Sequence, residues 1–371
     1  MKKRIKVLFT IPNFDTAGSG KALLKIATGL NLNLFEPHIA CSHNRGAFFE
    51  VVRNSGIPVH LIEYTSPARP IIQCLRECWR KSRFFKEFDI VHSYHYGPDY
   101  TEGLAVRMAG RKWVFTKKNM SWTGPSRRAW EFRSRLACRI AVQNHDMEKE
   151  FYPNSKKTWY LTRGVDTREF FPRERDLSLL RELGINEKAK IILCVANLVP
   201  VKGIEVLLRA FSNITGNTMY LLIVGEKDNE YGMQMQELAL SLHNGDRILF
   251  VGKRLDVWRF HTIADVFVLP TLNQGRKEGS PVSLLEAMAS GDAVIASAIP
   301  GIKDQLANFP ELMFEAGNVW ALKRLLEHIL GLNSTELSSL KANLVDEVQA
   351  HFTIEQEIHR HEELYLSLMN L

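Results

Sequence analysis

The chain carries the stretch Glu278-Gly-Ser-Pro-Val-Ser-Leu-Leu-Glu286-Ala-Met-Ala-Ser-Gly291, which places one carboxylate in a predicted loop and another in a predicted helix. Ser280 is the expected N-cap, Pro281 the first helical residue and Gly291 the C-terminal stop. The amides and positive dipole end of such a helix start suit a phosphate group. Because Glu286 lies about one and a half turns inside the helix, the two carboxylates could hold two rings of an elongated ligand such as a nucleotide-sugar. A loop glutamate and a solvated helix glutamate are the ordinary alternative.

The composition is that of a globular chain with more than one core. Its 371 residues, 45% hydrophobic and 24% charged, suggest two domains. No apolar run approaches the roughly 18 residues that span a bilayer, and the N-terminal residues lead straight into a strand, so neither a membrane span nor a signal peptide is expected. Five scattered cysteines favour a reducing cytoplasm. Cys74 and Cys78 could share a helix face, but no second Cys or His pair completes a zinc site.

Charge is distributed unequally along the chain. Residues 1–165 carry 28 Lys and Arg against 13 Asp and Glu, whereas residues 166–371 carry 20 against 28. The first part therefore has a balance of +15 and the second of −8, which together give the net charge of +7. This asymmetry predicts that the first domain faces an anionic partner, such as a membrane surface, a phosphorylated acceptor or a nucleic acid.

Short apolar runs alternate with amphipathic helical stretches in both parts of the chain. Continuous apolar runs are typical of parallel strands that are covered on both faces, so we expect two doubly wound, Rossmann-like α/β domains. We expect the domains at 1–165 and 166–350, followed by a C-terminal helix at 351–371. The expected strands are Val7–Ile11, His38–Ser42, Val59–Ile62, Asp89–Ser93, Lys112–Thr116, Ile140–Gln143, Ile191–Ala196, Met219–Val224, Ile248–Val251, Val266–Pro270 and Ala293–Ala296.

A glycine-containing segment follows the first expected strand and leads into a helix expected at 22–30. Gly18 and Gly20, which flank Ser19, would permit a tight turn whose amides cradle a diphosphate. The segment is not a Walker A loop, because that motif requires Gly where Asp15 stands and Ser or Thr where Ala22 stands. An ATPase or kinase is therefore a weaker interpretation, and a purely structural turn is the remaining alternative.

A second loop, Asn197-Leu-Val-Pro-Val-Lys-Gly203, follows a buried strand. Ligands of doubly wound sheets bind beyond the carboxyl ends of the strands. Lys202 is placed to neutralise a leaving diphosphate there, although a Lys-Gly pair before a helix is usually ordinary surface. The chain contains no Asp-x-Asp that could clamp a nucleotide-bound metal. We therefore expect neither a metal site nor a cofactor, and we expect fixed cations and amides to stabilise the diphosphate.

In their order along the chain, these elements resemble the retaining glycosyltransferases of family 4, which have the GT-B architecture of two facing Rossmann-like domains. The resemblance is dense over 191–304 and looser before it. The segments that carry it are Val195–Ala210, Leu222–Glu226, Phe250–Gly252, Ala264–Pro270, Glu278–Gly291 and Pro300-Gly301, with Gly18–Gly20, Asp89–His95, Arg163–Asp166 and Phe170 in the first part.

The resemblance implies a role for each matching residue. Glu278 is similar to the glutamate that contacts the donor sugar near the reacting centre, and Glu286 to the one that binds the ribose hydroxyls. In this family the donor lies in a cleft between the domains, and the last helix crosses back to the first domain. The other implied donor-binding residues are Gly18, Ser19, Gly20, Asn197, Lys202, Gly252, Lys253, Arg254, Gly279 and Ser280.

Two departures from the family pattern concern charged positions. Asn197 stands where the family usually has an arginine, and the missing cation could come from Arg163, Arg254, Arg276 or Lys277. Lys118 stands where an acceptor-side histidine is expected, and His92 and His95 are nearby candidates, although a histidine at a strand end is more often packed. The candidate catalytic residues are therefore Glu278, Lys202, Lys118 and His95.

The resemblance implies a hexosyltransferase that moves a sugar, with retention, from a nucleoside diphosphate sugar to a glycan or lipid-linked acceptor in bacterial surface polysaccharide assembly. Alternatives are a noncatalytic nucleotide-sugar or glycan binder, a nucleotide-sugar epimerase and a sugar-phosphate transferase of the same fold. Each of two basic tracts, 76–88 with interleaved aromatics and 107–135, is by itself more ordinarily a helix with its aromatics in the core and its cations in water. The balance of +15 favours a cytoplasmic protein in peripheral contact with an anionic membrane over one that binds nucleic acid.

Overall fold

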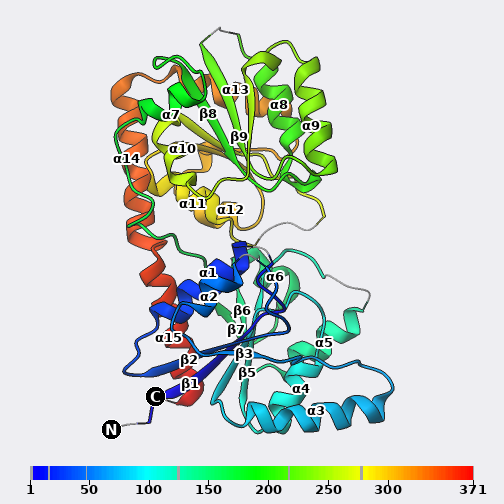
Figure 1. The fold of residues 1–371 in the computed structure, drawn as a ribbon. Coiled ribbons are helices and arrows are strands. Elements are labelled where there is room, and N and C mark those ends of the chain that lie inside the picture. Colours follow the sequence, from blue (N-terminus) through cyan, green and yellow to red (C-terminus); the bar gives the residue numbers. More distant parts are fainter. Residues whose placement is uncertain are drawn as a thin grey trace. The chain divides into compact units, whose positions relative to one another are not determined.

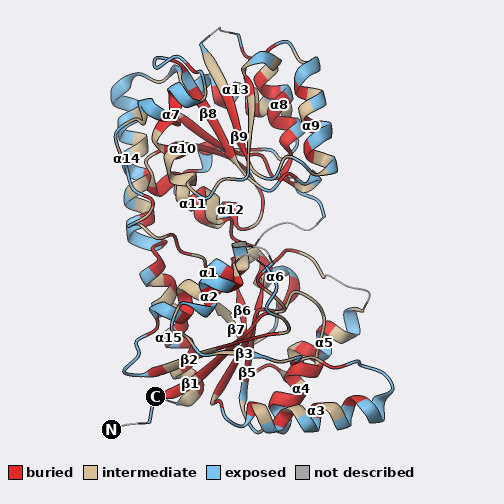
Figure 2. Cartoon of the chain, viewed as in Figure 1, coloured by how far each residue is buried: buried red, intermediate tan, exposed pale blue. Residues whose placement is uncertain are grey.

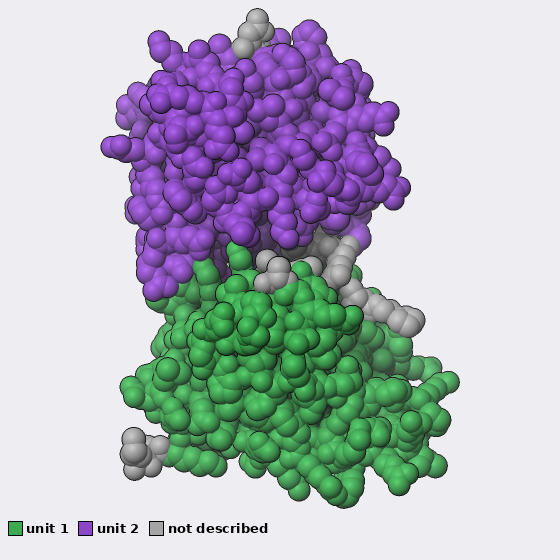
Figure 3. Space-filling model, viewed as in Figure 1, with its two compact units in different colours: residues 1–162, 354–371 green, residues 163–353 purple. Residues whose placement is uncertain are grey.

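A computed structural model describes residues 3–15, 17–46, 48–122, 126–215, 218–275 and 279–370. The chain divides into two compact units (Figure 3). Unit 1 comprises residues 1–162 and 354–371, and unit 2 comprises residues 163–353. The C-terminal segment therefore belongs to the same unit as the N-terminus.

The sheet of unit 1 is entirely parallel in its described part and follows the order β3-β2-β1-β4-β5-β6-β7 (Figure 1). The chain starts in the middle of the sheet, builds one edge, and then crosses back to build the other, as in doubly wound folds. The strands are β1 (Ile5–Thr10), β2 (Phe35–Cys41), β3 (Val59–Leu61), β4 (Ile90–Ser93), β5 (Lys112–Lys117), β6 (Arg139–Val142) and β7 (Thr158–Tyr160).

Helices cover both faces of this sheet. Alternate residues of each strand enter opposite cores because successive side chains point to opposite faces. Val7 and Phe9 of β1 join one buried cluster with α1 and α15, whereas Leu8 joins the other with α3, α4 and α5. The helices are α1 (Ala17–Gly29), α2 (Phe49–Arg53), α3 (Ile71–Phe85), α4 (Thr101–Met108), α5 (Arg127–Leu136), α6 (His145–Phe151) and α15 (Ile354–Met369).

The C-terminal helix α15 is an integral part of unit 1. Its residue Ile358 packs on Gly29 of α1 so closely that a Cβ at Gly29 would overlap it. The Asn31 amide donates to Glu362 Oε1 at 2.7 Å. Tyr365 is fully buried, and its hydroxyl lies 2.7 Å from His92 Nδ1. Unit 1 thus needs the end of the chain to complete its core.

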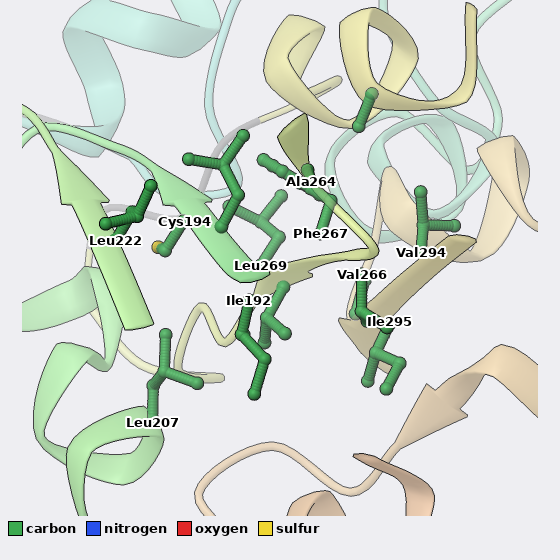
Figure 4. Close-up of a cluster of buried hydrophobic side chains, with 14 of the residues drawn as sticks. Ile192, Cys194, Leu207, Leu222, Ala264, Val266, Phe267, Leu269, Val294 and Ile295 are labelled. Atoms are coloured by element: carbon green, nitrogen blue, oxygen red, sulfur yellow. The ribbon is translucent and has the colours of Figure 1, made fainter. Parts of the chain in front are cut away.

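Unit 2 repeats the same strand order in a second sheet, β10-β9-β8-β11-β12-β13, again parallel throughout its described part. Its central strands are buried on both faces: Ile192, Phe267 and Ile295 have no exposed surface, and they lie in one apolar cluster (Figure 4). The strands are β8 (Lys190–Val195), β9 (Met219–Val224), β10 (Ile248–Gly252), β11 (Val266–Leu269), β12 (Ala293–Ser297) and β13 (Met313–Phe314).

The helices of unit 2 surround this sheet, and their inward faces are buried (Figure 2). Helix α8 packs on α13, and α11 packs on α14. The α-helices are α7 (Leu177–Glu182), α8 (Ile204–Ser212), α9 (Glu230–Ser241), α10 (Val257–Ile263), α11 (Val282–Ala289), α12 (Ile302–Gln305), α13 (Val319–Gly331) and α14 (Ser334–His351), and the short 3-10 helices are η1 (Pro200–Lys202), η2 (Gly245–Arg247) and η3 (Pro310–Leu312).

The predicted fold class is confirmed, and all eleven expected strands are present with ends shifted by a few residues. Two edge strands, β7 and β13, were not predicted. Both are too short to give a clear apolar run, since β7 has three residues and β13 has two. Among the described residues, none of the helices is both long and apolar enough to cross a bilayer.

Candidate functional site

The polar candidates of unit 2 lie at the carboxyl ends of its central strands. Because β8, β11 and β12 are neighbours in the sheet, the segments that follow them are adjacent. The Leu272 amide, beyond β11, donates to the Val201 carbonyl beyond β8 at 2.8 Å. Gly203 has a left-handed φ of +65°, and a Cβ there would overlap the Pro270 carbonyl oxygen. The loops after β8 and β11 therefore touch through their backbones, at the edge where doubly wound folds bind ligands.

Lys202 occupies the last position of the 3-10 helix η1 in this rim and is only 7% exposed. Burial of an ammonium group is costly unless anionic or polar partners compensate it. Its charge also reaches the β8 strand, where it lowers the pKa of the Cys194 thiol, although burial dominates and raises that pKa to about 12. The structure thus places a buried cation at the predicted diphosphate position.

The segment before α11 differs from the prediction in one detail. The helix begins at Val282, and its N-cap is Pro281 with an extended ψ of 119°, not Ser280. The Ser280 hydroxyl instead accepts a hydrogen bond from Gln305 Nε2 at 3.0 Å, and the Pro281 carbonyl accepts another at 3.1 Å. The prediction failed because a buried glutamine from a distant segment competes for the hydroxyl that would otherwise cap the helix.

The loop after β12 contacts the segment that precedes α11. Gly301, after β12, has a φ of +84°, and a Cβ there would overlap the Gly279 carbonyl oxygen. At the other end of α11, Gly291 has a φ of +81°, the Gly291 amide donates to Met288, and the Asp292 amide donates to Ala287. These two hydrogen bonds form a Schellman motif, so Gly291 ends the helix as predicted. Glu286 lies within α11 and is half-buried.

The remaining donor-side candidates of unit 2 differ in their surroundings. Asn197 is exposed immediately beyond β8, Gly252 ends β10 with a φ of +85°, and Lys253 is exposed. Arg254 is held by Asp256 at 2.8 Å and by Glu182 at 3.5 Å. These two ion pairs hold the guanidinium of Arg254 among carboxylates. Arg254 is therefore poorly placed to supply the cation that is expected at the position of Asn197.

Three residues named from the sequence, Arg276, Lys277 and Glu278, lie outside the described residues. The role of Glu278 therefore stays a prediction from the sequence.

In unit 1, the glycine segment does not form the predicted loop. Gly18, Ser19 and Gly20 lie in the first turn of α1, which begins at Ala17 rather than at residue 22. Gly20 has a packing role, since a Cβ there would lie 2.8 Å from the Phe14 ring. Ser19 Oγ is hydrogen-bonded to the Tyr96 hydroxyl. Gly20 therefore allows α1 to approach its aromatic neighbours instead of forming a turn, whereas a Cβ at Gly18 would meet nothing within 4 Å.

The two acceptor-side candidates lie near each other after β4 and β5. Lys118 Nζ donates to the Tyr94 carbonyl at 2.6 Å and lies 4.0 Å from the centre of the Tyr96 ring. His95 Nδ1 accepts from the Gly97 amide at 3.0 Å, and burial lowers the pKa of this imidazole, with Arg133 adding to the effect. His92, by contrast, is completely buried between Tyr365 and Thr116 and is a packed residue.

Sequence reasoning missed a buried charged network beside these residues. Glu102 accepts from Thr10 Oγ1 at 2.5 Å and from Ser93 Oγ at 2.6 Å, while Arg133 Nη2 donates to Ser93 Oγ at 3.2 Å. Both charged side chains are fully buried. Burial raises the pKa of Glu102, and Arg133 opposes this shift. Arg133 was assigned to a basic surface tract, and this was wrong; the aromatic residues around it in the sequence were the available signal.

The His, Cys, Asp and Glu side chains of the described residues were also compared with the requirements of a metal site. In the described ranges, no group of three or more His, Cys, Asp or Glu side chains could hold a metal ion. Cys74 and Cys78 are buried thiols of α3.

Part of the chain matches a known protein family. Residues 178–344 match the family described as Glycosyl transferases group 1. This range contains the rim of unit 2 that was described above, from Lys202 to Gly301. Most of unit 2 is therefore similar in sequence to this family.

Individual relatives agree with this match. The N-acetyl-alpha-D-glucosaminyl L-malate synthase of Bacillus anthracis is 33% identical over 38% of this chain, and the chain covers 35% of its length. The UDP-Gal:alpha-D-GlcNAc-diphosphoundecaprenol alpha-1,3-galactosyltransferase of Escherichia coli is 24% identical over 76% of both chains. Among solved structures, Anabaena Alr3699/HepE in complex with UDP and glucose is 16% identical, with a TM-score of 0.82 over 99% of this chain and 100% of that one. The fold is thus that of GT-B proteins.

Proposed function

We propose that this chain, whose residues 178–344 match the glycosyl transferases group 1 family, is a hexosyltransferase. It transfers a sugar from a nucleoside diphosphate sugar to a glycan or lipid-linked acceptor, with retention of the anomeric configuration. The observation that carries the proposal is the coincidence of the family match with a backbone-lined rim that holds a buried lysine.

The chemistry of the rim fits the departure of a diphosphate. The charge that develops on a leaving diphosphate is best stabilised by fixed donors that are positioned before the reaction. Lys202 supplies an ammonium group, and the amides of Gly279 and Ser280 precede α11. Glu286 would bind the ribose, and Glu278 would contact the sugar. In retaining transfer the diphosphate itself accepts the acceptor proton, so the enzyme's task is to position the acceptor and to stabilise charge.

The acceptor assignment rests on the relatives and on charge. One relative is named for a diphosphoundecaprenol-linked sugar. The strongly basic residues 1–165 suit an anionic, lipid-linked diphosphate acceptor. We assign the protein to bacterial surface polysaccharide assembly at the cytoplasmic face of the membrane.

The test is the release of nucleoside diphosphate from a panel of nucleoside diphosphate sugars, each with and without added lipid-linked acceptor. We expect one donor to be turned over, and we expect Lys202→Ala to lower the rate about 100-fold or more. Lys188→Ala is the matched control, because Lys188 is exposed and precedes β8 whereas Lys202 follows it. Equal loss in both variants would contradict the proposed role of Lys202.

A second candidate function is noncatalytic binding of a nucleotide-sugar, which the exposed Asn197 at the family's arginine position favours. Thermal-shift measurements with the same panel separate the two functions. Stabilisation by a donor without release of diphosphate would support the binder, an epimerised donor would support an epimerase, and no response to any donor would overturn the proposal.

A further inference from the structure

Helix α3 of unit 1 has one well-anchored face. Cys74, Cys78 and Phe85 are buried in a core cluster that also contains Ala105 and Val106 of α4. With the buried Ser82, these positions recur every three to four residues, as expected for the inward face of an amphipathic helix. Substitutions elsewhere on α3 should therefore leave the fold of unit 1 intact.

The outward face of α3 exposes large apolar side chains. Ile71 is 69% exposed, Ile72 84%, Leu75 44% and Trp79 58%. At about 100° per residue these four positions form one continuous stripe beside the buried face. Apolar side chains that gather in this way on a surface mark an interaction site, whereas single exposed ones do not.

A basic stripe runs alongside the apolar one. Arg76, Arg80 and Arg83 are exposed and lie one turn apart on the helix. The guanidinium of Arg83 lies 4.4 Å from the centre of the Trp79 ring, so the two stripes meet there. Glu77 pairs with Arg80 at 2.7 Å and is the sole acidic residue of α3, which is described completely. The surface is therefore apolar along one side and cationic along the other.

We propose that α3 docks unit 1 on an anionic lipid bilayer. The helix lies in the plane of the interface, with Ile71, Ile72, Leu75 and Trp79 among the acyl chains. Arg76, Arg80 and Arg83 contact the headgroup phosphates. An amphipathic helix with bulky apolar residues on one side and arginines on the other is the form that binds such interfaces.

A lipid surface fits this face better than a protein partner does. In an antiparallel two-fold contact between copies of the chain, each basic stripe would approach the same stripe of the other copy, which is repulsive. The apolar stripe runs for about 12 Å along one helix of about 22 Å, and this is small for a stable protein interface, which buries roughly 800 Å² on each partner. The docking does not depend on sugar transfer, and its test involves no turnover.

The test is co-sedimentation of the full chain with vesicles of phosphatidylcholine, either pure or mixed with phosphatidylglycerol, at low and high salt. We expect binding to the mixed vesicles that weakens with salt. Each of Arg76→Gln, Arg80→Gln and Arg83→Gln should weaken it about fivefold, which corresponds to about 1 kcal/mol. The double variant Ile72→Ser with Trp79→Ser should abolish binding to the mixed vesicles. Leu240→Ser on α9 is the matched control, because Leu240 is 81% exposed but lies in unit 2.

Three outcomes would overturn the proposal. One is equal binding to neutral and anionic vesicles, and another is a loss in Leu240→Ser as large as in Ile72→Ser. The third is a dimer in solution that Ile72→Ser converts to a monomer, which would make this face a contact between copies. Tryptophan fluorescence gives an independent readout: vesicles should cause a blue shift in the wild type that is reduced in Trp79→Phe.

Discussion

The two units build the same strand order, but they treat the carboxyl ends of their sheets differently. In unit 1 this end is filled by side chains: Thr10, Ser93, Glu102 and Arg133 form a buried hydrogen-bonded network. In unit 2 the corresponding loops contact each other through their backbones at Gly203 and at Gly301. The side chain of Lys202, in the same loops, is a buried cation.

The difference shows how one topology can serve two tasks. A rim filled by paired side chains is fixed internally and leaves few groups for a ligand. A rim of glycines and loop amides brings the backbone close enough to contact phosphate oxygens. This difference supports our proposal that unit 2 binds the donor, and we expect the charged network of unit 1 to act mainly in positioning the residues around it.

The largest effect is expected from Arg133→Met. The substitution leaves the buried Glu102 carboxylate without its cation, which typically costs about 3–5 kcal/mol of folding free energy. Hydrogen exchange followed by mass spectrometry should show loss of protection in β4 and β5, while β8 and β11 stay protected.

The double variant Glu102→Gln with Arg133→Met is the control. It removes both charges, so much of the lost protection should return. The guanidinium of Arg133 also lies 4.7 Å from the centre of the Phe115 ring. If the double variant were as unstable as Arg133→Met alone, the main role of Arg133 would be to pack against aromatic rings rather than to pair with Glu102.

Gly203→Ala tests the rim of unit 2. A Cβ there overlaps the Pro270 carbonyl oxygen at a φ of +65°, and overpacking together with a left-handed conformation should cost about 2–4 kcal/mol. Gly184→Ala is matched to it, because Gly184 has a φ of +69° with nothing within 4 Å; this change should cost about 1 kcal/mol. Urea unfolding of both variants measures the difference, and equal costs would show that the backbone contact is unimportant.

The pH dependence of stability should have opposite signs in the two units. Burial raises the pKa of Glu102, so its contribution is present below its ordinary pKa of 4.5 and is lost as the pH rises through the folded value. In unit 2, the Ser178 hydroxyl and Arg259 lower the pKa of Asp176 to about 2. The contribution of Asp176, about 1 kcal/mol after allowance for solvent, is present above the ordinary pKa of 3.8 and is lost as the pH falls towards 2.

Melting temperatures of the wild type, Glu102→Gln and Asp176→Asn across this pH range measure both effects. As the pH falls, the melting temperature of the wild type should rise relative to that of Glu102→Gln. The excess of the wild-type melting temperature over that of Asp176→Asn should disappear. Asparagine keeps the N-cap that Asp176 provides for α7, so the second comparison reports charge. If both differences in melting temperature changed in the same direction with pH, the opposite contributions of Glu102 and Asp176 would be contradicted.

The sequence predicted the sheets well because continuous apolar runs are a local signal. Strands such as Ile191–Ala196 were recognisable from their own residues, and β8 differs from that range by one residue at each end. The edge strands β7 and β13 lacked such a signal. The start of α1 was misplaced because glycine was assumed to require a turn, whereas Gly20 accommodates the Phe14 ring, a contact that no local pattern reveals.

The positions of candidate residues were predictable where those residues directly follow a strand. They were not predictable where the contacts come from segments far apart in the sequence. Lys202 lies on the rim because it follows β8. The partners of Arg133 come from β4 and α4, and its burial contradicts the ordinary preference of arginine for the surface. The exposed residues Ile71, Ile72 and Leu75 were missed because an apolar run before basic residues resembles an ordinary core face.

The smallest predicted effect concerns Ser280, for which sequence and structure give different partners. If the hydroxyl accepts from Gln305, as the 3.0 Å distance indicates, Ser280→Ala should cost about 0.5–1.5 kcal/mol. The loss should disappear in the background of Gln305→Leu, because the partner is then already absent. A double-mutant cycle by urea unfolding should therefore give a coupling of similar size. A helix cap would act independently of Gln305, so additive losses would restore Ser280 as the N-cap of α11 and reject the contact from α12.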